Sequence, residues 1–417
     1  MGFHVDAEVG TLEQVLMCQP GVEAYLGSTM PKEQALQLEK FDINLMRQQW
    51  TNLKKMYTSM DVEVVDYKGV LGEASTPTMC FDDLVSGILL KYEGAERSIV
   101  EALLSEDVTT YGENAAIAMN EVLIGDLDID TKKEVLANAT FTCDPGMLVG
   151  PVCVLSKMRD PIRQREVEVY KTVMQALGHT DFFEVTEGVF EGGDGMVMNN
   201  AFYSGAGSRS TPEAIKQIGG MLHGRFGMDS WIIHIPEAPN MPAYREFLSA
   251  EGKSLEYDGN MGIMHLDTIA MAVLEGPVSG EKTIIYGCKT ILQYCQAIPV
   301  QQGHPVSLLH HIEGDGYAIK GWGEIRDIPL YEQQQLEPNM TVVSVGTVAG
   351  IAPTQTETAD MLELDEIYAP RIDMSEFAKC GGRGHCASGQ LKKSAPWMSS
   401  MYAAANQAVE VPLARAV

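Results

Sequence analysis

Short apolar runs alternate with helical stretches through the last two thirds of the chain, and this alternation constrains the fold more than any other feature. Helical spacing of apolar residues occurs at about 163–177, 212–223 and 242–250. Strands that alternate with helices indicate α/β construction. Because the apolar runs are short and bounded by turn residues, we expect several small sheets and not one long parallel sheet. The runs lie at residues 147–155, 182–185, 196–203, 231–235, 269–274, 283–286 and 341–345.

The N-terminal part of the chain has a larger helical share. We expect a strand at 12–18, a helix from about 32 to 60 and a short strand at 62–67. From 76 to 137 the apolar spacing is helical again, which predicts a helical insertion between strands. Neither a Pro/Gly/Ser-rich linker nor a repeat of fixed period divides the sequence. We therefore predict a single domain over residues 1–417 that carries this insertion.

Composition and charge narrow the classes of partner. Hydrophobic residues make up 45% and charged residues 21% of the chain, which is the balance of a globular protein. The net charge of −27 repels nucleic-acid phosphates and anionic lipid surfaces, so neither nucleic acid nor membrane is an expected partner. The first residues do not form a signal peptide, and the eight cysteines are spread along the chain. We expect a soluble, cytoplasmic protein, with homo-oligomerisation left open.

A glycine-rich segment near the C-terminus carries two thiols. It reads Cys380-Gly-Gly-Arg-Gly-His-Cys386. Glycines allow positive φ and the close approach of a ligand, so we expect Cys386 to be presented at the end of a turn. By itself the segment fits a flexible turn with a disulfide or inert thiols better than a reactive site. A zinc hydrolase site on Cys380, His385 and Cys386 is an alternative, although the gap between the two cysteines is not a common zinc spacing.

Three further segments place polar side chains next to predicted strands. FEGGD at 190–194 sets two carboxylates around a Gly-Gly turn, and Asp144 precedes a proline. His265 and Asp267 would point to the same face of an extended chain. Each segment alone fits a solvated surface turn. Together with Cys386 they supply a thiol nucleophile, an imidazole for proton transfer and carboxylates able to hold a cation.

The order and spacing of these segments resemble the arginine deiminase family, within the guanidine-modifying enzyme or amidinotransferase superfamily. The resemblance implies a five-bladed pseudo-symmetric α/β propeller of ββαβ units, with a helical insertion after the first unit. The predicted insertion at 76–137 lies at that place. The matching segments are AEVGTLEQVLMCQPG at 7–21, FTCDP at 141–145, MRDPIRQRE at 158–166, FEGGD at 190–194, GAGSRSTPEAI at 205–215, MHLD at 264–267 and GHC at 384–386.

The same resemblance implies a role for each site residue. Cys386 would be the nucleophile, and His265, held by Glu191, would be the general acid and base. Asp144 and Asp267 would bind the guanidinium nitrogens. The implied substrate-binding residues are Asn138, Phe141, Arg163, Arg209 and Asp194, with the two arginines at the substrate carboxylate and Asn138 at the amino acid end.

The predicted reaction is a two-step hydrolysis through a thiouronium on Cys386, most simply of L-arginine to L-citrulline and ammonia, without a metal or cofactor. A small cationic guanidine is the expected partner. One alternative is an amidinotransferase that passes the amidino group to an amine, and another is a non-catalytic guanidine-binding protein. Cys143 and Gly381 stand where the family usually has arginine. These two departures leave the identity of the guanidine compound open.

Overall fold

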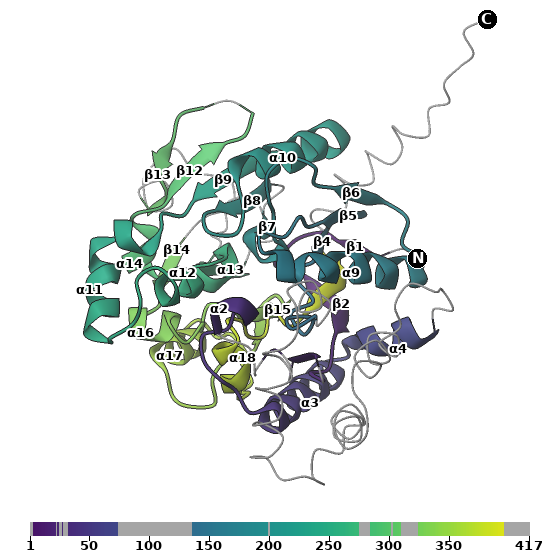
Figure 1. Ribbon diagram of the computed structural model, residues 1–417, viewed down its shortest axis with the longest axis horizontal. Helices are drawn as coiled ribbons and strands as arrows, with labels where there is room; N and C mark the ends of the chain where they lie inside the picture. Colours follow the sequence, from purple (N-terminus) through teal and green to yellow (C-terminus); the bar gives the residue numbers. More distant parts are fainter. Residues whose placement is uncertain are drawn as a thin grey trace, which may run out of the picture.

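The computed structural model describes residues 3–21, 23–24, 27, 32–73, 136–198, 201–274, 284–301, 303–309 and 324–395. Strands and helices alternate along these residues, which confirms the predicted α/β class. In Figure 1, strands β2, β7 and β15 lie nearer the middle of the molecule than helices α3, α10 and α11. Nearly all of the predicted insertion at 76–137 lies outside the described residues. None of the described helices is long and apolar enough to cross a membrane.

The described strands form five small sheets, and the first sheet shows the pattern that the others repeat. Strand β17 (Gly389–Ser394) pairs antiparallel with β2 (Thr11–Met17). Strand β2 then pairs parallel with β3 (Glu63–Asp66). A short strand β1 (His4–Val5) adds in parallel to the outer side of β17. The sheet therefore joins the two ends of the described chain.

Each of the other sheets also contains an antiparallel pair, and in these sheets the two paired strands are consecutive in the chain. In three of them the second strand of the pair has a parallel neighbour. In the fourth, parallel bridges from residues 347 and 351 take the place of that neighbour. The sheets are β4 (Gly146–Val149), β5 (Val152–Leu155) and β6 (Phe182–Glu184); β7 (Gly195–Met198), β8 (Ala201–Ala206) and β9 (Asp229–His234), extended by β12 (Gln296–Pro299) and β13 (Val306–Ser307); β10 (Ala270–Leu274), β11 (Ile284–Gly287) and β14 (Glu324–Asp327); and β15 (Thr341–Ser344) with β16 (Thr347–Ala349).

Helices connect the strands that run parallel, because such strands need a crossover connection. Helix α3 lies between β2 and β3, α9 between β5 and β6, and α10 between β8 and β9. The repeating unit is thus an antiparallel pair, a helix and a parallel strand. The helices are α2 (Lys32–Ala35), α3 (Ile43–Ser59), α4 (Tyr67–Glu73), η2 (Pro161–Arg163), α9 (Gln164–Ala176), η3 (Gly192–Asp194), α10 (Pro212–Phe226), η4 (Ala238–Asn240), α11 (Pro242–Ala250), α12 (Asp258–Gly262), α13 (Leu266–Ile269), α14 (Lys289–Leu292), α16 (Leu330–Gln333), α17 (Glu357–Leu364) and α18 (Ser375–Lys379).

Sequence-based predictions needed correction at the helix expected from 32 to 60 and at the runs 147–155 and 196–203. The run at 196–203 contains the antiparallel strands β7 and β8 and is not one strand. The single helix expected from 32 to 60 is two helices, because Leu36 has a φ of 58° and ends α2. Asp42 then caps α3 by accepting hydrogen bonds from the next turn. The run at 147–155 is not one strand but the hairpin of β4 and β5, and Gly150 turns it with a φ of 56°. The expectation of several small sheets is confirmed.

Candidate active site

The turn before the leading strand of each antiparallel pair contributes a polar side chain to one buried site. Asp144 precedes β4, Glu191 precedes β7 and Asp267 precedes β10. Asn339 precedes β15 and Cys386 precedes β17. All five side chains are buried. Residues that are far apart in sequence therefore meet because they occupy corresponding places in the repeated units.

Cys386 is held by Asn339 and faces Asp267. The Asn339 side-chain oxygen accepts a hydrogen bond from the Cys386 backbone N–H at 3.1 Å, and its amide donates to Cys386 Sγ at 3.1 Å. The Sγ atom lies 3.4 Å from Asp267 Oδ2. Burial raises the pKa of the Cys386 thiol well above its usual value, and the carboxylates of Asp267 and Asp144 raise it further. The sulfur is therefore a neutral thiol unless a cation comes close to it.

Within the described part of the chain, His265 is fixed through one ring nitrogen. Its Nε2 atom is hydrogen bonded to Glu191 Oε2 at 3.0 Å, and its Nδ1 atom lies 3.8 Å from Asp144 Oδ1. Burial lowers the pKa of His265, but the surrounding carboxylates, Asp144 foremost, outweigh burial and raise it to about 9. The Glu191 pKa is held down to about 2, because Arg209 and His265 overcome the effect of its burial. The imidazole is therefore a cation at neutral pH, with an ionised partner.

Three buried atoms at this site have no hydrogen-bond partner among the described residues: Asp144 Oδ1, His265 Nδ1 and Asp267 Oδ1. The second oxygen of each carboxylate is already hydrogen bonded. Cys386 Sγ lies within 4.8 Å of ligating atoms of both Asp144 and His265. An unpaired buried polar atom costs about 1–3 kcal/mol, so three in one place are unusual. The site is built to hydrogen bond a small polar ligand next to the thiol.

Two glycines keep space at the site. A Cβ atom on Gly193 would lie 2.6 Å from His265 Nδ1 and 3.0 Å from Asp144 Oδ1, so any side chain there would collide with two of the unpaired atoms. A Cβ atom on Gly382 would lie 2.6 Å from the Phe141 ring and 2.8 Å from the Cys386 Cβ. The glycines of these segments are therefore required by close packing around the reactive groups.

The Arg163 guanidinium is engaged by acids of the protein itself. It donates to Asp144 Oδ2 at 2.8 Å and to Glu166 Oε2 at 2.8 and 3.0 Å, and it lies 3.8 Å from Glu191 Oε2. These carboxylates outweigh burial and raise the Arg163 pKa. Arg163 thus fixes the orientation of Asp144, and a substrate carboxylate would have to share it with three acids.

A cavity of about 250 Å³ reaches Cys386 from one side. Arg209 has fewer partners here than Arg163: one amino group contacts Met261 Sδ at 3.2 Å, and another lies 3.8 Å from Glu191 Oε1. Of the two predicted arginines, Arg209 is therefore the one with N–H groups available to a ligand. The cavity wall includes Asn138, Phe141, Asp144, Arg163, Arg209 and Cys386.

The side chains of Asp194 and Asn138 hydrogen bond to other parts of the protein. Asp194 Oδ2 accepts a hydrogen bond from Ser210 at 2.6 Å, and Oδ1 accepts one from the backbone N–H of Leu266 at 3.0 Å. The side-chain amide of Asn138 donates to the carbonyl of Ala35 at 3.0 Å. Asp194 therefore sets the position of α13, and through it of the adjacent His265, and does not line the cavity.

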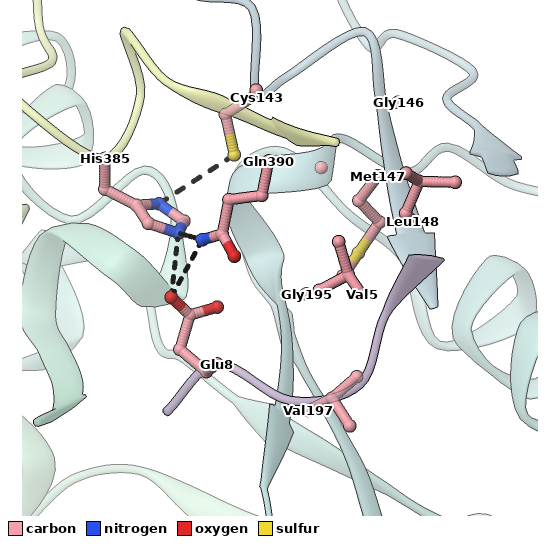
Figure 2. Close-up of a pocket in the computed structure, with 12 residues that line it drawn as sticks. Val5, Glu8, Cys143, Gly146, Met147, Leu148, Gly195, Val197, His385 and Gln390 are labelled. Atoms are coloured by element: carbon pink, nitrogen blue, oxygen red, sulfur yellow. Dashed lines mark hydrogen bonds and ion pairs between the residues drawn. The ribbon is translucent and has the colours of Figure 1, made fainter. Parts of the chain in front are cut away.

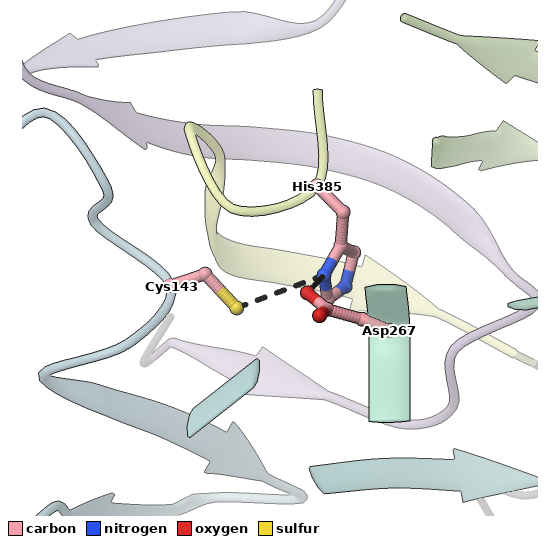
Figure 3. Close-up of side chains that lie close together, drawn as sticks. All are labelled: Cys143, Asp267 and His385. Atoms are coloured by element: carbon pink, nitrogen blue, oxygen red, sulfur yellow. Dashed lines mark hydrogen bonds and ion pairs between the residues drawn. The ribbon is translucent and has the colours of Figure 1, made fainter. Parts of the chain in front are cut away.

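A second imidazole, His385, lies behind Asp267. Figure 3 shows the Cys143 thiol and the Asp267 carboxylate approaching the same ring nitrogen of His385. Nδ1 lies 2.7 Å from Asp267 Oδ2 and 3.8 Å from Cys143 Sγ. Nε2 lies 3.4 Å from Glu8 Oε1 and 3.3 Å from the Gln390 amide nitrogen. Although burial lowers the pKa of His385, these neighbours raise it well above its usual value.

Two of these groups are not predicted from the sequence. His385 is expected there only as a zinc ligand, and Asn339 is not expected at the site. The proposed zinc set of Cys380, His385 and Cys386 is not brought together: among the described residues, His385 groups with Cys143 and Asp267, whereas Cys380 joins no such group. A signal for Asn339 existed, since it directly precedes an apolar run in the same way that Asp144 does.

Two local predictions at the site were wrong. Cys386 is 2% exposed and not presented on an open turn, because the glycine segment packs beneath Phe141 and Phe377. Its Gly381 does have the expected positive φ, of 89°. His265 and Asp267 do not share the face of a strand. His265 has extended backbone angles directly before helix α13, and the helical turn sends Asp267 toward Cys386.

Comparison with known proteins places this arrangement in a family. Residues 118–240 match the family model described as arginine deiminase. An arginine deiminase from Bacillus cytotoxicus is 24% identical over 297 residues, covering 64% of this chain and 66% of the relative, which is just under two thirds of its length. The uncharacterised protein YkgA of Bacillus subtilis is 31% identical over 255 residues, covering 61% of this chain and 69% of the relative.

Solved structures give the same fold at low identity. DDAH from Pseudomonas aeruginosa, a mutant complexed with citrulline, has a TM-score of 0.54 and 13% identity, covering 91% of this chain and 99% of that chain. The N-terminal domain of ArgZ, a mutant of a cyanobacterial arginine dihydrolase bound to substrate, has a TM-score of 0.51 and 14% identity, covering 91% and 98%. The family model and the arginine deiminase relatives confirm the predicted family. This chain belongs to the arginine deiminase family.

Proposed function

We propose that this protein hydrolyses a guanidinium group with Cys386 as the nucleophile, and that the substrate is L-arginine, converted to L-citrulline and ammonia. The observation that carries the proposal is the set of three unpaired buried atoms beside the Cys386 thiol. Family membership supports the class of reaction. The proposed reaction needs no metal or cofactor.

A guanidinium group suits the unpaired atoms in charge and in shape. It is planar and offers five N–H donors in a fixed geometry. Asp144 Oδ1 and Asp267 Oδ1 are both acceptors without partners among the described residues, and both belong to carboxylates close to Cys386 Sγ. Held between these two oxygens, the guanidinium would lie with its central carbon within reach of the sulfur. Fixed geometry of this kind removes much of the entropic barrier to attack.

In the first step the Cys386 sulfur bonds to the guanidinium carbon. The substrate cation offsets the carboxylates that keep the thiol protonated, so that binding favours the thiolate and the thiol proton passes to solvent. Cationic His265, with Nδ1 near Asp144, donates its proton to the departing nitrogen. Ammonia leaves, and a thiouronium remains on the sulfur.

In the second step water replaces the sulfur. His265 is now neutral and removes a proton from a water molecule as the oxygen bonds to the thiouronium carbon. The carbon–sulfur bond then breaks, which releases the ureido product and restores Cys386. Glu191 holds the same imidazole through both transfers by its bond to Nε2. The sum is one water consumed and one ammonia released.

For the fold, we infer that the five sheets are five ββαβ units arranged around a pseudo-fivefold axis. Each sheet has the same order of an antiparallel pair followed by a parallel neighbour or parallel bridges. The polar residues before the leading strands meet at one place, as an axial site requires. We also propose that the predicted helical insertion near 76–137 belongs to the first unit.

For the amino acid end of the substrate, we propose Arg209 as the main contact of the carboxylate. Its guanidinium lines the cavity that reaches Cys386 and has fewer protein partners than Arg163. Asn138 and Phe141 form other parts of the same wall. An Arg–carboxylate pair is usually bidentate and selects substrates that carry the acid.

The test is a product assay over a small panel of guanidines: arginine, agmatine, N-methylated arginines and guanidinoacetate. The purified full-length chain should release citrulline and ammonia from arginine in equal amounts without an added amine. Cys386→Ala should bind arginine in calorimetry and release no product.

The other outcomes identify the competing functions. Product that appears only after an amine acceptor is added would replace hydrolysis by amidinotransfer. Binding of arginine without turnover of any compound in the panel would indicate a non-catalytic binding protein. Turnover of another guanidine, and not of arginine, would keep the reaction and correct the substrate.

A further inference from the structure

Cys143, His385 and Asp267 form a second cluster that the proposed reaction does not fully use. Their ligating atoms lie within 4.8 Å of one another, and all three residues are buried. The Cys143 thiol and one Asp267 oxygen converge on a single nitrogen, His385 Nδ1 (Figure 3). Among side chains, a thiol, an imidazole and a carboxylate are the usual ligands of zinc and similar divalent cations.

The spacing of these atoms suits one shared cation. Sulfur and nitrogen ligands on a tetrahedral zinc lie about 3.5 Å apart, and nitrogen and oxygen ligands about 3.3 Å apart, given the usual bond lengths. The observed separations are 3.8 Å between Cys143 Sγ and His385 Nδ1 and 2.7 Å between His385 Nδ1 and Asp267 Oδ2. The distance between His385 Nδ1 and Asp267 Oδ2 must increase by roughly half an ångström, as expected when a cation replaces the proton that the two atoms share.

The far side of the imidazole is also arranged as in a metal site. Glu8 Oε1 lies 3.4 Å from His385 Nε2, so a carboxylate faces the nitrogen that would not bind the metal. Such an outer carboxylate fixes the tautomer of a ligating histidine and strengthens it as a ligand. Figure 2 shows Glu8, His385 and Cys143 on the wall of one cavity, of about 400 Å³. Neither Cys386 nor His265 lines this cavity, which is therefore distinct from the cavity that reaches Cys386.

We propose that Cys143 Sγ, His385 Nδ1 and Asp267 Oδ2 form a binding site for a thiophilic divalent cation such as Zn²⁺, with water as the fourth ligand. Binding releases two protons to solvent, one from the Cys143 thiol and one from the His385 ring, while Asp267 binds through its carboxylate. No electron transfer and no further reactant is involved.

The expected consequence is reversible inhibition. Asp267 belongs to both clusters: its Oδ2 atom lies 2.7 Å from His385 Nδ1 and 3.4 Å from Cys386 Sγ. A cation on Oδ2 draws the carboxylate toward His385 and repels a guanidinium cation from the neighbouring oxygen. This consequence rests on the proposed function, whereas binding of the cation does not.

The binding test is spectroscopic and does not depend on activity. Co²⁺ is titrated into the full-length protein after a chelator has been used and removed, and the thiolate-to-cobalt charge-transfer band is followed in the near ultraviolet. One equivalent should produce the band, and Zn²⁺ should abolish it by competition. Cys143→Ser should remove the band. Cys153→Ser, which changes a buried thiol in β5, is the matched control and should keep it.

Two further variants locate the cation. Cys386→Ser should retain the band, since Cys386 lies in the other group of potential ligands. Glu8→Gln should weaken Co²⁺ binding by about 10- to 100-fold, the usual effect of losing an outer partner. Glu8 contacts neither Cys386 nor His265 in the described structure, so this variant also serves if Cys143→Ser is unstable.

The outcomes separate the two proposals. A band that is lost in Cys386→Ser and kept in Cys143→Ser would place the cation at the nucleophile and overturn the inference, as would the absence of any band. If Zn²⁺ inhibits the unmodified enzyme and Cys143→Ser resists inhibition, both proposals are supported. A band that depends on Cys143 in a protein that turns over no guanidine would support the cation site and refute the proposed function.

Discussion

Two clusters of the same residue types, each with a thiol, an imidazole and a carboxylate, lie next to each other at the site. They differ in how many of their polar atoms have a hydrogen-bond partner. Cys386, His265 and Asp144 form one, and Cys143, His385 and Asp267 form the other. In the described structure His265 Nδ1 and Asp144 Oδ1 of the first cluster have no hydrogen-bond partner, whereas in the second cluster only Asp267 Oδ1 lacks one and both ring nitrogens of His385 contact polar atoms. Residue type alone therefore does not identify the reactive cluster. The unpaired atoms do, because they are what a substrate can bond.

The largest expected difference concerns the two thiols. Cys386→Ala removes the proposed nucleophile and should lower kcat by about 10⁴- to 10⁶-fold, in the range found when a covalent catalyst loses its nucleophile. Cys143→Ala removes a thiol that touches only His385 among the catalytic surroundings, so kcat should change by less than about tenfold. Steady-state kinetics with arginine measure both. Similar losses in the two variants would contradict the assignment of Cys386.

The two imidazoles give the next comparison. His265→Asn removes the proposed acid and base, and we expect kcat to fall by about 10²- to 10⁴-fold. His385→Asn leaves that group intact and acts only through the orientation of Asp267, so a loss of roughly tenfold in kcat/KM is expected. Proton-inventory measurements on the slower step would show a solvent isotope effect that disappears in His265→Asn alone. A larger loss in His385→Asn would reverse the roles of the two clusters.

The two cavity arginines allow a smaller and more selective effect. Arg209→Gln should raise KM for arginine by about 10- to 100-fold, because a hydrogen bond to a charged group contributes about 1.5–3 kcal/mol. It should leave KM for agmatine, which lacks the carboxylate, nearly unchanged. The matched control is Arg159→Gln, since the Arg159 side chain bonds the nearby carbonyl of Ser208 and does not line the cavity. An equal effect of Arg209→Gln on the KM of both substrates would show that Arg209 does not bind the substrate carboxylate.

Much of the fold could be predicted because apolar spacing reports which faces are buried. The helix expected at 242–250 is α11, and the strand expected at 12–18 is β2 with a shift of one residue. The failures occurred where a single backbone angle decides the outcome. Leu36 adopts a positive φ inside an otherwise helical pattern, and Gly150 turns a continuous apolar run into a hairpin. Neither angle follows from periodicity.

The site was predictable only as far as its residues had recognisable chemistry. The carboxylates, His265 and Cys386 were chosen because thiol, imidazole and acids form a coherent set. Asn339 has no titratable group, and its importance follows from its two bonds to Cys386. The contact of Cys143 with His385 spans 242 residues, so only the folded chain brings them together. The two clusters differ in whether their polar atoms have hydrogen-bond partners, and this can be determined only from the three-dimensional structure.

The smallest expected signal tests how Cys386 becomes reactive in an acidic site. A unit positive charge about 4 Å from the sulfur is worth about 4 kcal/mol at an effective dielectric constant of 20, enough to favour the thiolate strongly. Saturating methylguanidinium should therefore increase the thiolate ultraviolet absorbance at a fixed, mildly alkaline pH. The increase should be absent in Cys386→Ser and retained in Cys143→Ser, since the Cys143 sulfur contacts His385 Nδ1 and lies in the other group of potential ligands. If the absorbance is unchanged on binding, or if the change depends on Cys143, the substrate cation is not what activates Cys386, and His265 or another described cation must do so without it.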